Sequence, residues 1–464
     1  MNLHFGKFLC LLLVSVSQIN NLQAQLNVLT SQEKKDGWEL LFNGKDLTGF
    51  KQLNGEAKYR VEDGAIVGTT VPNTPNSFLA TVKDYGDFIL EVELKVDNSM
   101  NSGIQFRSLS LPEVKNGRVH GYQMEIDPSD RAWSGGIYDE ARRDWLYIPN
   151  INPLAKTAFK KEAWNKYRIE AIGPVIRTWV NGVPVSVLID DLTLSGLIAF
   201  QVHAIGKDAV PGKEIRWRNI KINTKNLKAM PLDQTPVVNL LTNKLSEQEK
   251  FQGFVSLFNG SDMTGWRNVH SDKMPSVRWK TQDGILMVGG SDGSETGNDI
   301  VTKDKYSAFE LVFDFKLTEG ANSGIKYFVD ESYDSNGKSG VGLEFQILDD
   351  AKHPDAKEGV VGNRTLGSLY DLIPSIKVEP RFQKKIGDWN TGRVIVYPDN
   401  KVQHWLNGYK VVEYERKSPI YKALVARSKY VKYPGFGAAD AGHILIQDHG
   451  DNVSFKNIKI RKIN

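Results

Sequence analysis

The sequence contains almost no cysteine, because Cys10 is the only one among its 464 residues. Cys10 lies in an N-terminal segment that carries Lys7, an apolar run over residues 8–16, and Ala24 before Gln25. This pattern is typical of a signal peptide, predicted here as residues 1–24. The mature chain would have no thiol, which excludes disulfides, thiolate metal sites and a cysteine nucleophile. We therefore expect an exported bacterial protein, periplasmic or secreted, whose stability comes from large cores.

Charge of one sign and long apolar runs are also missing. The chain has 59 Lys and Arg against 55 Asp and Glu, a formal net charge of +4. This excess is too small for a nucleic-acid-binding surface. No apolar run is long enough to span a membrane as a helix, the N-terminal one included. The sequence also has no phosphate loop, dinucleotide fingerprint or nucleophile elbow. It does have ten Trp, which gives mild support to carbohydrate binding, because flat rings stack on sugars.

The chain repeats itself. Five motifs recur in the same order: Leu-Phe-Asn-Gly (41–44 and 257–260), Asn-Ser-Gly-Ile (101–104 and 322–325), Trp-x-Asn-Gly (179–182 and 405–408), Gln-x-His (201–203 and 447–449) and Asn-Ile-Lys-Ile (219–222 and 457–460). The repeating unit is about 200 residues, enough for one independent core and far too long for a solenoid repeat. We predict two domains, at residues 26–225 and 245–464, joined by a linker at 226–244.

Strand patterns dominate both units. Residues 88–96 and 309–317 alternate apolar and charged side chains, which predicts strands with one buried face. The two Trp-x-Asn-Gly motifs predict tight hairpins, because Asn-Gly suits the positive φ angles of such turns. We therefore predict an all-β protein of two tandem jelly-roll β-sandwiches. The second unit has longer insertions, at 379–386 and 418–442, which we expect at the rim of a ligand-binding sheet.

Several strands place polar residues two apart, hence on one face. These pairs are Gln123 with Glu125, Gln105 with Arg107 and Gln201 with His203 in the first unit, and Glu344 with Gln346, Lys326 with Phe328 and Gln447 with His449 in the second. Each set combines a carboxylate and a histidine with polar or cationic groups. Such a set indicates a site on a curved sheet, although a merely solvated face gives the same pattern. The segment around His353 is a weak metal motif, because no second ligand is spaced to complete it.

Taken together, the motifs resemble the 3-keto-disaccharide hydrolase domain family. Gly-x-x-Tyr-Asp segments at 135–139 and 367–371 complete the resemblance, which spans nearly all of the mature chain. The resemblance implies a concanavalin A-like jelly roll with its site on the concave sheet. It also implies a carbohydrate substrate: a sugar oxidised at carbon 3, cleaved by hydrolysis or by elimination of the group at carbon 1.

A ketone at carbon 3 acidifies the hydrogen on carbon 2, so catalysis needs a base, a cation for the enolate and a general acid. In the second unit we expect His449 and Glu344 as base and acid, with Lys326 beside the oxyanion. The parallel residues of the first unit are His203, Glu125 and Arg107. The expected substrate-binding residues are Gln123, Trp133, Tyr138, Trp145, Gln201, Gln346, Tyr370, Asp371 and Gln447. A divalent cation could replace the Lys or Arg role, but nothing in the spacing demands one, and no other cofactor is predicted.

The two units differ where it matters for chemistry. The first has Gln123 where the second has Glu344, and Glu125 where the second has Gln346, so the carboxylate moves along one face. Both copies therefore need not catalyse the same step. Two other functions stay open: a non-catalytic glycan-binding module, and an endo-glucanase of the same fold. An endo-glucanase needs two carboxylates flanking the scissile bond. The neighbour of Glu344 on its own face is an amide instead.

Overall fold

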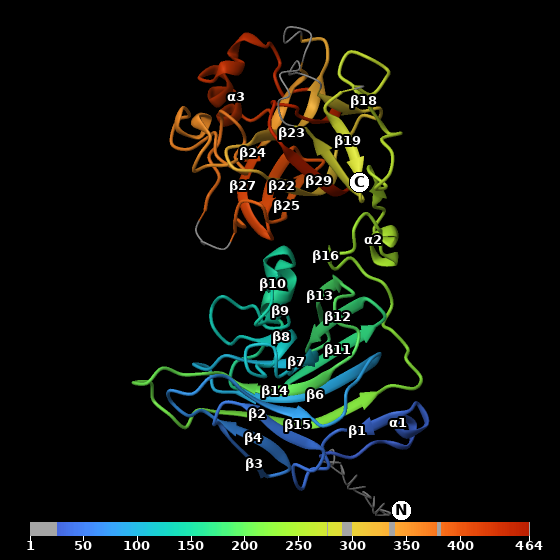
Figure 1. The fold of residues 1–464 in the computed structure, drawn as a ribbon, viewed down its shortest axis with the longest axis vertical. Helices are drawn as coiled ribbons and strands as arrows, with labels where there is room; N and C mark the ends of the chain where they lie inside the picture. Colours follow the sequence, from blue (N-terminus) through green and yellow to red (C-terminus); the bar gives the residue numbers. More distant parts are fainter. Residues whose placement is uncertain (1–25, 276, 290–298, 334–338, 378–381, 464) are drawn as a thin grey trace, which may run out of the picture.

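The computed structural model describes residues 26–275, 277–289, 299–333, 339–377 and 382–463. The chain folds into two β-sandwiches that follow one another along the long axis (Figure 1). The prediction of an all-β protein with two tandem sandwiches is therefore confirmed. The predicted signal peptide lies outside the described residues, as does the start of the insertion predicted at 379–386. Among the described residues, no helix is both long and apolar enough to cross a bilayer.

The first sandwich pairs a nine-stranded sheet with a seven-stranded one. In order, the larger sheet contains β16 (Val237–Asn239), β13 (Val183–Ile189), β12 (Val175–Val180), β11 (Asn165–Ile172), β6 (Phe88–Val96), β15 (Glu214–Asn223), β4 (Ala65–Thr69) and β3 (Lys58–Glu62), with β1 (Trp38–Leu40) also paired to β15. The smaller sheet contains β10 (Asp144–Tyr147), β9 (Ile137–Glu140), β8 (His120–Ile126), β7 (Ser102–Leu109), β14 (Leu197–Val202), β5 (Ser77–Thr81) and β2 (Phe50–Asn54).

The second sandwich repeats this plan with fewer described strands. Its larger sheet contains β19 (Trp279–Gln282), β20 (Ile285–Val288), β29 (Val453–Lys462), β22 (Phe309–Leu317), β25 (Asn390–Val396), β26 (Lys401–Leu406) and β27 (Tyr409–Glu415), with β17 (Val255–Ser256) paired to β29. Its smaller sheet contains β18 (Trp266–Asn268), β21 (Ile300–Thr302), β28 (His443–Ile446), β23 (Asn322–Asp330) and β24 (Val341–Leu348).

The alternation of apolar and polar residues along each strand determines which of its two faces is buried. Every second residue of β6, from Phe88 to Val96, belongs to the core between the two sheets of the first sandwich. On β8, Tyr122, Met124 and Ile126 enter the same core. Because successive side chains point to opposite faces, Gln123 and Glu125 must lie on the outer face of the seven-stranded sheet.

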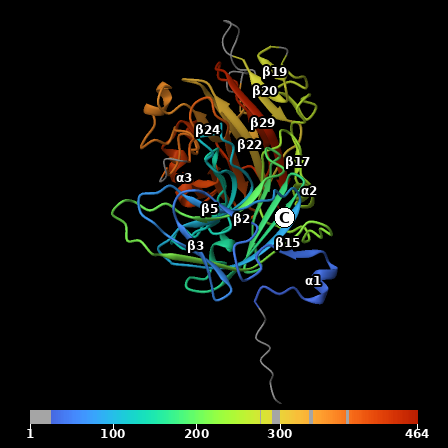
Figure 2. The same cartoon turned by 60° about the horizontal axis from the view of Figure 1, so that its bottom comes forward.

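Short helices occupy equivalent places in the two sandwiches. Both α1 (Ser31–Lys35) and α2 (Glu247–Phe251) begin with a capping box. Glu33 pairs with Lys221 of β15, and Glu249 pairs with Lys459 of β29, so each helix lies against the long strand of its own larger sheet (Figure 2). The remaining helical pieces are η1 (Pro149–Ile151), η2 (Pro153–Thr157), η3 (Pro354–Lys357), α3 (Pro419–Ala426) and η4 (Lys429–Lys432).

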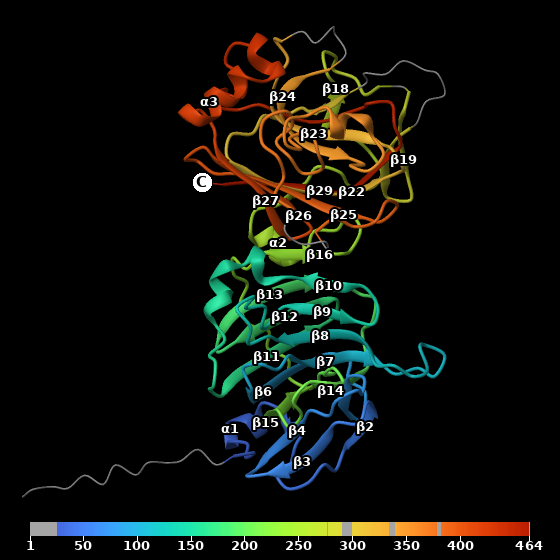
Figure 3. The ribbon, with the colours of Figure 1, turned by 90° about the vertical axis from the view of Figure 1, so that its left-hand side faces the viewer.

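The segment between the domains contributes a strand to the first sandwich. Within the predicted linker, β16 pairs in parallel with β13 and so extends the larger sheet of the first sandwich. The edge strands β10 and β16 lie next to the second sandwich (Figure 3). There the ring of Trp133 lies 6.3 Å from that of Tyr409, and Trp405 packs against the first core. The two sandwiches therefore meet through aromatic contacts as well as through the chain.

Candidate active site

The repeated Asn-Ser-Gly motif joins the strands that form each site. Ser102 Oγ donates to the carbonyl of Gln201 at 2.6 Å, and Ser323 Oγ donates to that of Gln447 at 2.8 Å. In each sandwich this bond connects the motif strand to the Gln-x-His segment. The motif thus holds two neighbouring segments of the sheet side by side.

The glycine of the same motif leaves room for a side chain two residues away from its direct partner on the neighbouring strand. In antiparallel register, Gly103 lies across from Glu125 and Gly324 across from Gln346. A Cβ at Gly103 would lie 2.2 Å from Gln123 Cδ, and one at Gly324 would lie 2.3 Å from Glu344 Oε1. The glycine is therefore needed so that the residue at position 123 or 344 can lie flat across the sheet.

We expect Gly324→Ala to lower turnover at the second site by about 10- to 100-fold, because the new methyl group displaces the Glu344 carboxylate by about 1 Å. The fold should survive, since a flexible side-chain end gives way rather than the backbone. Steady-state kinetics and a thermal melt on the same preparation check both parts. Unchanged kcat at an unchanged melting temperature would contradict the role of this glycine.

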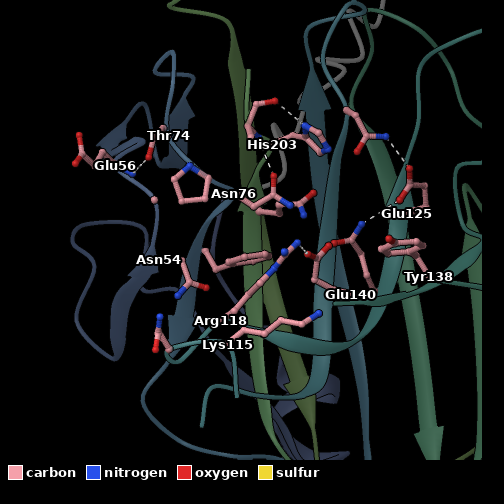
Figure 4. A pocket seen from close by; sticks show the side chains of 18 of the residues that line it. Asn54, Glu56, Thr74, Asn76, Lys115, Arg118, Glu125, Tyr138, Glu140 and His203 are labelled. Atoms are coloured by element: carbon pink, nitrogen blue, oxygen red, sulfur yellow. Dashed lines mark hydrogen bonds and ion pairs between the residues drawn. The ribbon is translucent and has the colours of Figure 1, made fainter. Parts of the chain in front are cut away.

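The first candidate site is a broad cavity of about 990 Å³ on the outer face of the seven-stranded sheet. Figure 4 shows Glu125, Tyr138, Glu140 and His203 around it, together with loop residues such as Asn76. Of the residues predicted for this domain, those that line the cavity are Gln123, Glu125, Tyr138, Trp145, Gln201 and His203. The structure therefore brings together six of the eight residues predicted for this domain.

The base of this cavity is a chain of amides that ends at Glu125. Gln105 Nε2 donates to Gln123 Oε1 at 2.6 Å, and Gln123 Nε2 donates to Glu125 Oε2 at 3.0 Å. Asn101 Nδ2 at 2.6 Å and Arg131 at 3.3 Å donate to the other carboxylate oxygen of Glu125. Burial raises the pKa of Glu125 to about 7, although these donors favour the ionised form. Such a carboxyl group is suited to exchange protons near neutral pH.

Gln201 is the polar group here without a partner. The side chain is fully buried and lines the cavity, yet neither its amide oxygen nor its amide nitrogen has a hydrogen-bond partner. A buried amide left unsatisfied costs free energy, so it normally has a partner in the working state. His203 lies beside it, exposed, with its Nδ1 2.8 Å from the carbonyl oxygen of Ala204. A ligand with hydroxyl groups offers the hydrogen-bond partners that Gln201 lacks.

The second candidate site is smaller, about 220 Å³, and lies at the equivalent place on the five-stranded sheet. The predicted residues that line it are Lys326, Glu344, Gln346, Tyr370, Gln447 and His449. Lys326 lies directly across from Glu344 in the antiparallel register, where the first sandwich has Gln105 across from Gln123. The register confirms the shift of the carboxylate between the domains: a charged pair in the second is a neutral pair in the first.

The ionisable side chains of the second site lie close together on the walls of the cavity. Glu344 is 5% exposed, and burial raises the pKa of its carboxyl group even though Lys326, Lys429 and His449 are nearby. The Lys326 ammonium donates to Ser339 Oγ at 3.0 Å and to the Gly340 carbonyl at 3.2 Å. A largely buried carboxyl group and a positioned cation therefore share one cavity.

The insertion at 418–442 forms one wall of this cavity and supplies residues that the sequence analysis did not identify. It folds into α3 and η4 rather than simple loops, and Lys429, Tyr430 and Tyr433 line the cavity. Lys429 is exposed as a residue, but its ammonium lies 4.1 Å from the centre of the Tyr370 ring, and desolvation lowers its pKa. The high content of Lys and Tyr in the insertion is the sequence feature that could have pointed to these residues. The prediction that the insertion lies at the rim of the sheet is confirmed.

Three of the predicted site residues lie outside the two cavities: Arg107, Trp133 and Asp371. The prediction that Arg107 shares the face of Gln105 is wrong, because a bulge with φ of 46° at Arg107 breaks the alternation. Its guanidinium is fully buried and donates to the carbonyl oxygens of Gly86 and Gly173 and to Asp87. The equivalent residue, Phe328, has φ of 51°.

Trp133 and Asp371 are also outside the cavities. The Trp133 ring is buried, 4.7 Å from that of Trp145 and beside the second sandwich, so of these two tryptophans Trp145 alone lines the cavity. Asp371 accepts hydrogen bonds from Arg364 Nε and the backbone N–H of Lys429. Asp371 therefore positions the segment that carries Lys429 instead of contacting a ligand.

The comparisons with known proteins agree with this geometry. The sequence profile of the 3-keto-alpha-glucoside-1,2-lyase-like domain matches residues 37–223 and again 253–461. The chain belongs to this family. A 3-keto-disaccharide hydrolase of Bacteroides thetaiotaomicron is 34% identical over 262 residues, which are 51% of this chain and 84% of that protein.

Two crystal structures from Parabacteroides distasonis ATCC 8503, both of candidate glycosyl hydrolases, are also similar. The first is 31% identical, with a TM-score of 0.42, and the match covers 48% of this chain and 100% of that one. The second is 26% identical, with a TM-score of 0.34, and the match covers 45% and 99%. Each match therefore spans about half of the present chain, which carries the family domain twice.

Proposed function

We propose that this protein cleaves glycosides of sugars oxidised at carbon 3, by elimination across carbons 1 and 2 followed by addition of water. The observation that carries the proposal is the second cavity, where a buried carboxyl group of raised pKa and two lysines surround a space of about 220 Å³. Membership of a family described by 3-keto-alpha-glucoside 1,2-lyase activity supports the choice of substrate.

The proposed elimination uses three groups of the second site. Glu344 takes the proton from carbon 2, which the neighbouring ketone has acidified. The Lys326 ammonium stabilises the enolate oxygen formed on carbon 3. The electron pair then forms the bond between carbons 1 and 2 and expels the oxygen on carbon 1, which takes a proton from Lys429. The products are an unsaturated 3-keto sugar and the free alcohol, and a later addition of water completes a net hydrolysis.

A lowered pKa suits Lys429 to the role of acid, because a less basic ammonium gives up its proton more readily. Tyr370 and Gln447 supply hydrogen-bonding groups on the wall. The first site would follow the same course, with Glu125 as base and Arg131 in place of Arg107 as the nearby cation. Gln201 would bind a sugar hydroxyl there.

The experiment is to incubate the purified mature chain with a nitrophenyl 3-keto-glucoside and to follow nitrophenol release. The matched control is the same glucoside with an unoxidised carbon 3. We expect release only from the keto substrate, because only that ketone acidifies the hydrogen on carbon 2. Equal release from both substrates would indicate an ordinary glycosidase, and binding of both without release would indicate a lectin.

The pH dependence of the first site follows from the pKa of Glu125. That pKa is raised to about 7, so Glu125 is protonated below this pH and acts as a base only above it. In a Glu344→Gln background, we expect the remaining kcat/KM to rise tenfold per pH unit up to about pH 7 and then level off. Arg131→Gln should move the inflection to higher pH, because it removes a charge that favours the carboxylate. A flat profile between pH 5 and 8 would contradict Glu125 as the base.

We also propose that the protein acts outside the cytoplasm, on the basis of its signal-peptide pattern at residues 1–24. Expression of the full sequence in a bacterial host should yield a periplasmic or secreted chain that starts at Gln25. Mass spectrometry of that fraction checks the cleavage site. Recovery of the uncleaved chain in the cytoplasm alone would contradict export.

A further inference from the structure

Two histidines and an aspartate converge beside the second cavity, which His449 lines. His449 follows β28, Asp451 lies two residues further on, and His353 precedes η3. One side-chain ligand atom from each of the three residues lies within 4.8 Å of the other two. The two imidazole rings are 6.1 Å apart and nearly perpendicular, at 84°. The sequence alone gave no second ligand for His353; the fold supplies two of them.

We propose that His353, His449 and Asp451 form a binding site for a divalent transition-metal ion. Two imidazoles and one carboxylate are a ligand set that suits Zn²⁺, Fe²⁺, Co²⁺ or Mn²⁺, whereas Mg²⁺ and Ca²⁺ prefer oxygen ligands alone. Three protein ligands leave coordination positions open, as in catalytic rather than structural sites. His449 also lines the second cavity, so an ion held by these residues would lie next to it.

A buried acceptor without a partner lies next to this cluster. Asn322 is 3% exposed and lines the same cavity, and its Oδ1 accepts no hydrogen bond. The backbone N–H of Asn322 donates to Asp451 Oδ2 at 3.0 Å, so the orphaned oxygen belongs to a residue in direct contact with the proposed ligand. A water molecule bound to the metal would provide the donor that Asn322 Oδ1 lacks.

Hydrogen bonds already orient two of the three proposed ligands. The bond from Asn322 fixes one oxygen of Asp451 and leaves the other for the metal. His353 Nδ1 accepts a long hydrogen bond of 3.2 Å from the backbone N–H of Asp355. Metal binding at the other ring nitrogen requires Nδ1 to carry the proton, so this weak contact must be released. The gain of a metal bond outweighs the loss of one long hydrogen bond.

The first sandwich provides an internal control. Its Gln-x-His segment has His203 in place of His449, but Ile205 stands where the second has Asp451. Among the residues that the structure describes, no second cluster of three such ligands occurs. The proposal therefore predicts one metal ion per chain, although the family domain occurs twice.

The test is calorimetric titration of Zn²⁺ into tag-free, chelator-treated mature chain, with Co²⁺ absorption as a second readout of imidazole ligation. We expect one equivalent per chain. His353→Ala and Asp451→Asn should each weaken binding by at least about tenfold. Asp451→Asn keeps an oxygen for the Asn322 N–H, so the local fold should hold. His203→Ala should leave the affinity and the stoichiometry unchanged.

The inference does not depend on the proposed reaction, because the readout is binding of the metal alone. It is overturned if the wild type binds no Zn²⁺, or if His353→Ala and Asp451→Asn both bind it as tightly as the wild type. Loss of an equivalent in His203→Ala would equally overturn it. A metal-binding protein that fails to cleave 3-keto-glucosides would refute the proposed function and leave the metal site standing.

Discussion

Glu344→Gln is expected to lower kcat at the second site by about 10²- to 10⁴-fold, the usual contribution of a positioned general base. The substitution keeps the shape of the side chain and removes its ability to take a proton. KM should change little, because an amide still offers a hydrogen-bonding oxygen to the sugar. Activity should be measured in a Glu125→Gln background, so that the first site does not hide the loss. Glu319→Gln, on an exposed side chain outside the cavity, is the matched control.

The double variant Glu344→Gln, Gln346→Glu tests whether the position of the carboxylate matters as well as its charge. It moves the carboxylate two residues along β24, to the place that Glu125 occupies on β8 of the first sandwich. Lys326 lies across from position 344 and not from 346, so we expect no recovery of turnover. Recovery to near wild-type kcat would contradict the assignment of Glu344 and Lys326 as a working pair.

The fold could be predicted from the sequence to a large extent because strand patterns are local. Period-two alternation placed β6 and β22 at residues 88–96 and 309–317, with the bounds that the structure shows. The Asn-Gly turns gave both hairpins, since Asn181 and Asn407 adopt the positive φ that this turn demands. The duplication strengthened these predictions, because each motif that is weak alone recurs in the second unit.

The site could be predicted only where the alternation holds. Gln123 and Glu125 were assigned to one face correctly, whereas Arg107 was not, because a bulge inserts a residue with positive φ and turns its side chain away. The alternation of residues in the sequence does not reveal where such a bulge occurs. The positions of Lys429 and His353 could not be predicted for another reason: both residues come from segments distant in sequence. Only packing of those segments brings Lys429 to the cavity and His353 to His449.

Breaking a buried ion pair next to the second site should strongly destabilise its sandwich. Arg278 Nε lies 2.7 Å from Asp448 Oδ2, and the two side chains are 2% and 0% exposed. Asp448 stands between Gln447 and His449, and its backbone N–H donates to Asp299. Arg278→Met leaves the carboxylate buried without its partner, which costs about 3–5 kcal/mol. For a domain of this size, that cost lowers the melting temperature of the second sandwich by about 6–20 °C.

The first sandwich has no carboxylate at this place, because Val202 stands at the position of Asp448. The double variant Arg278→Met, Asp448→Val removes both charges and fills the space with apolar groups. Replacing both members of a buried pair is often neutral, whereas removing one is not. We therefore expect the double variant to be more stable than either single variant in calorimetric scans of the full chain. Additive losses would contradict this coupling. Because Asp448 anchors the strand end that carries His449, the double variant should also show whether that anchor is needed for turnover.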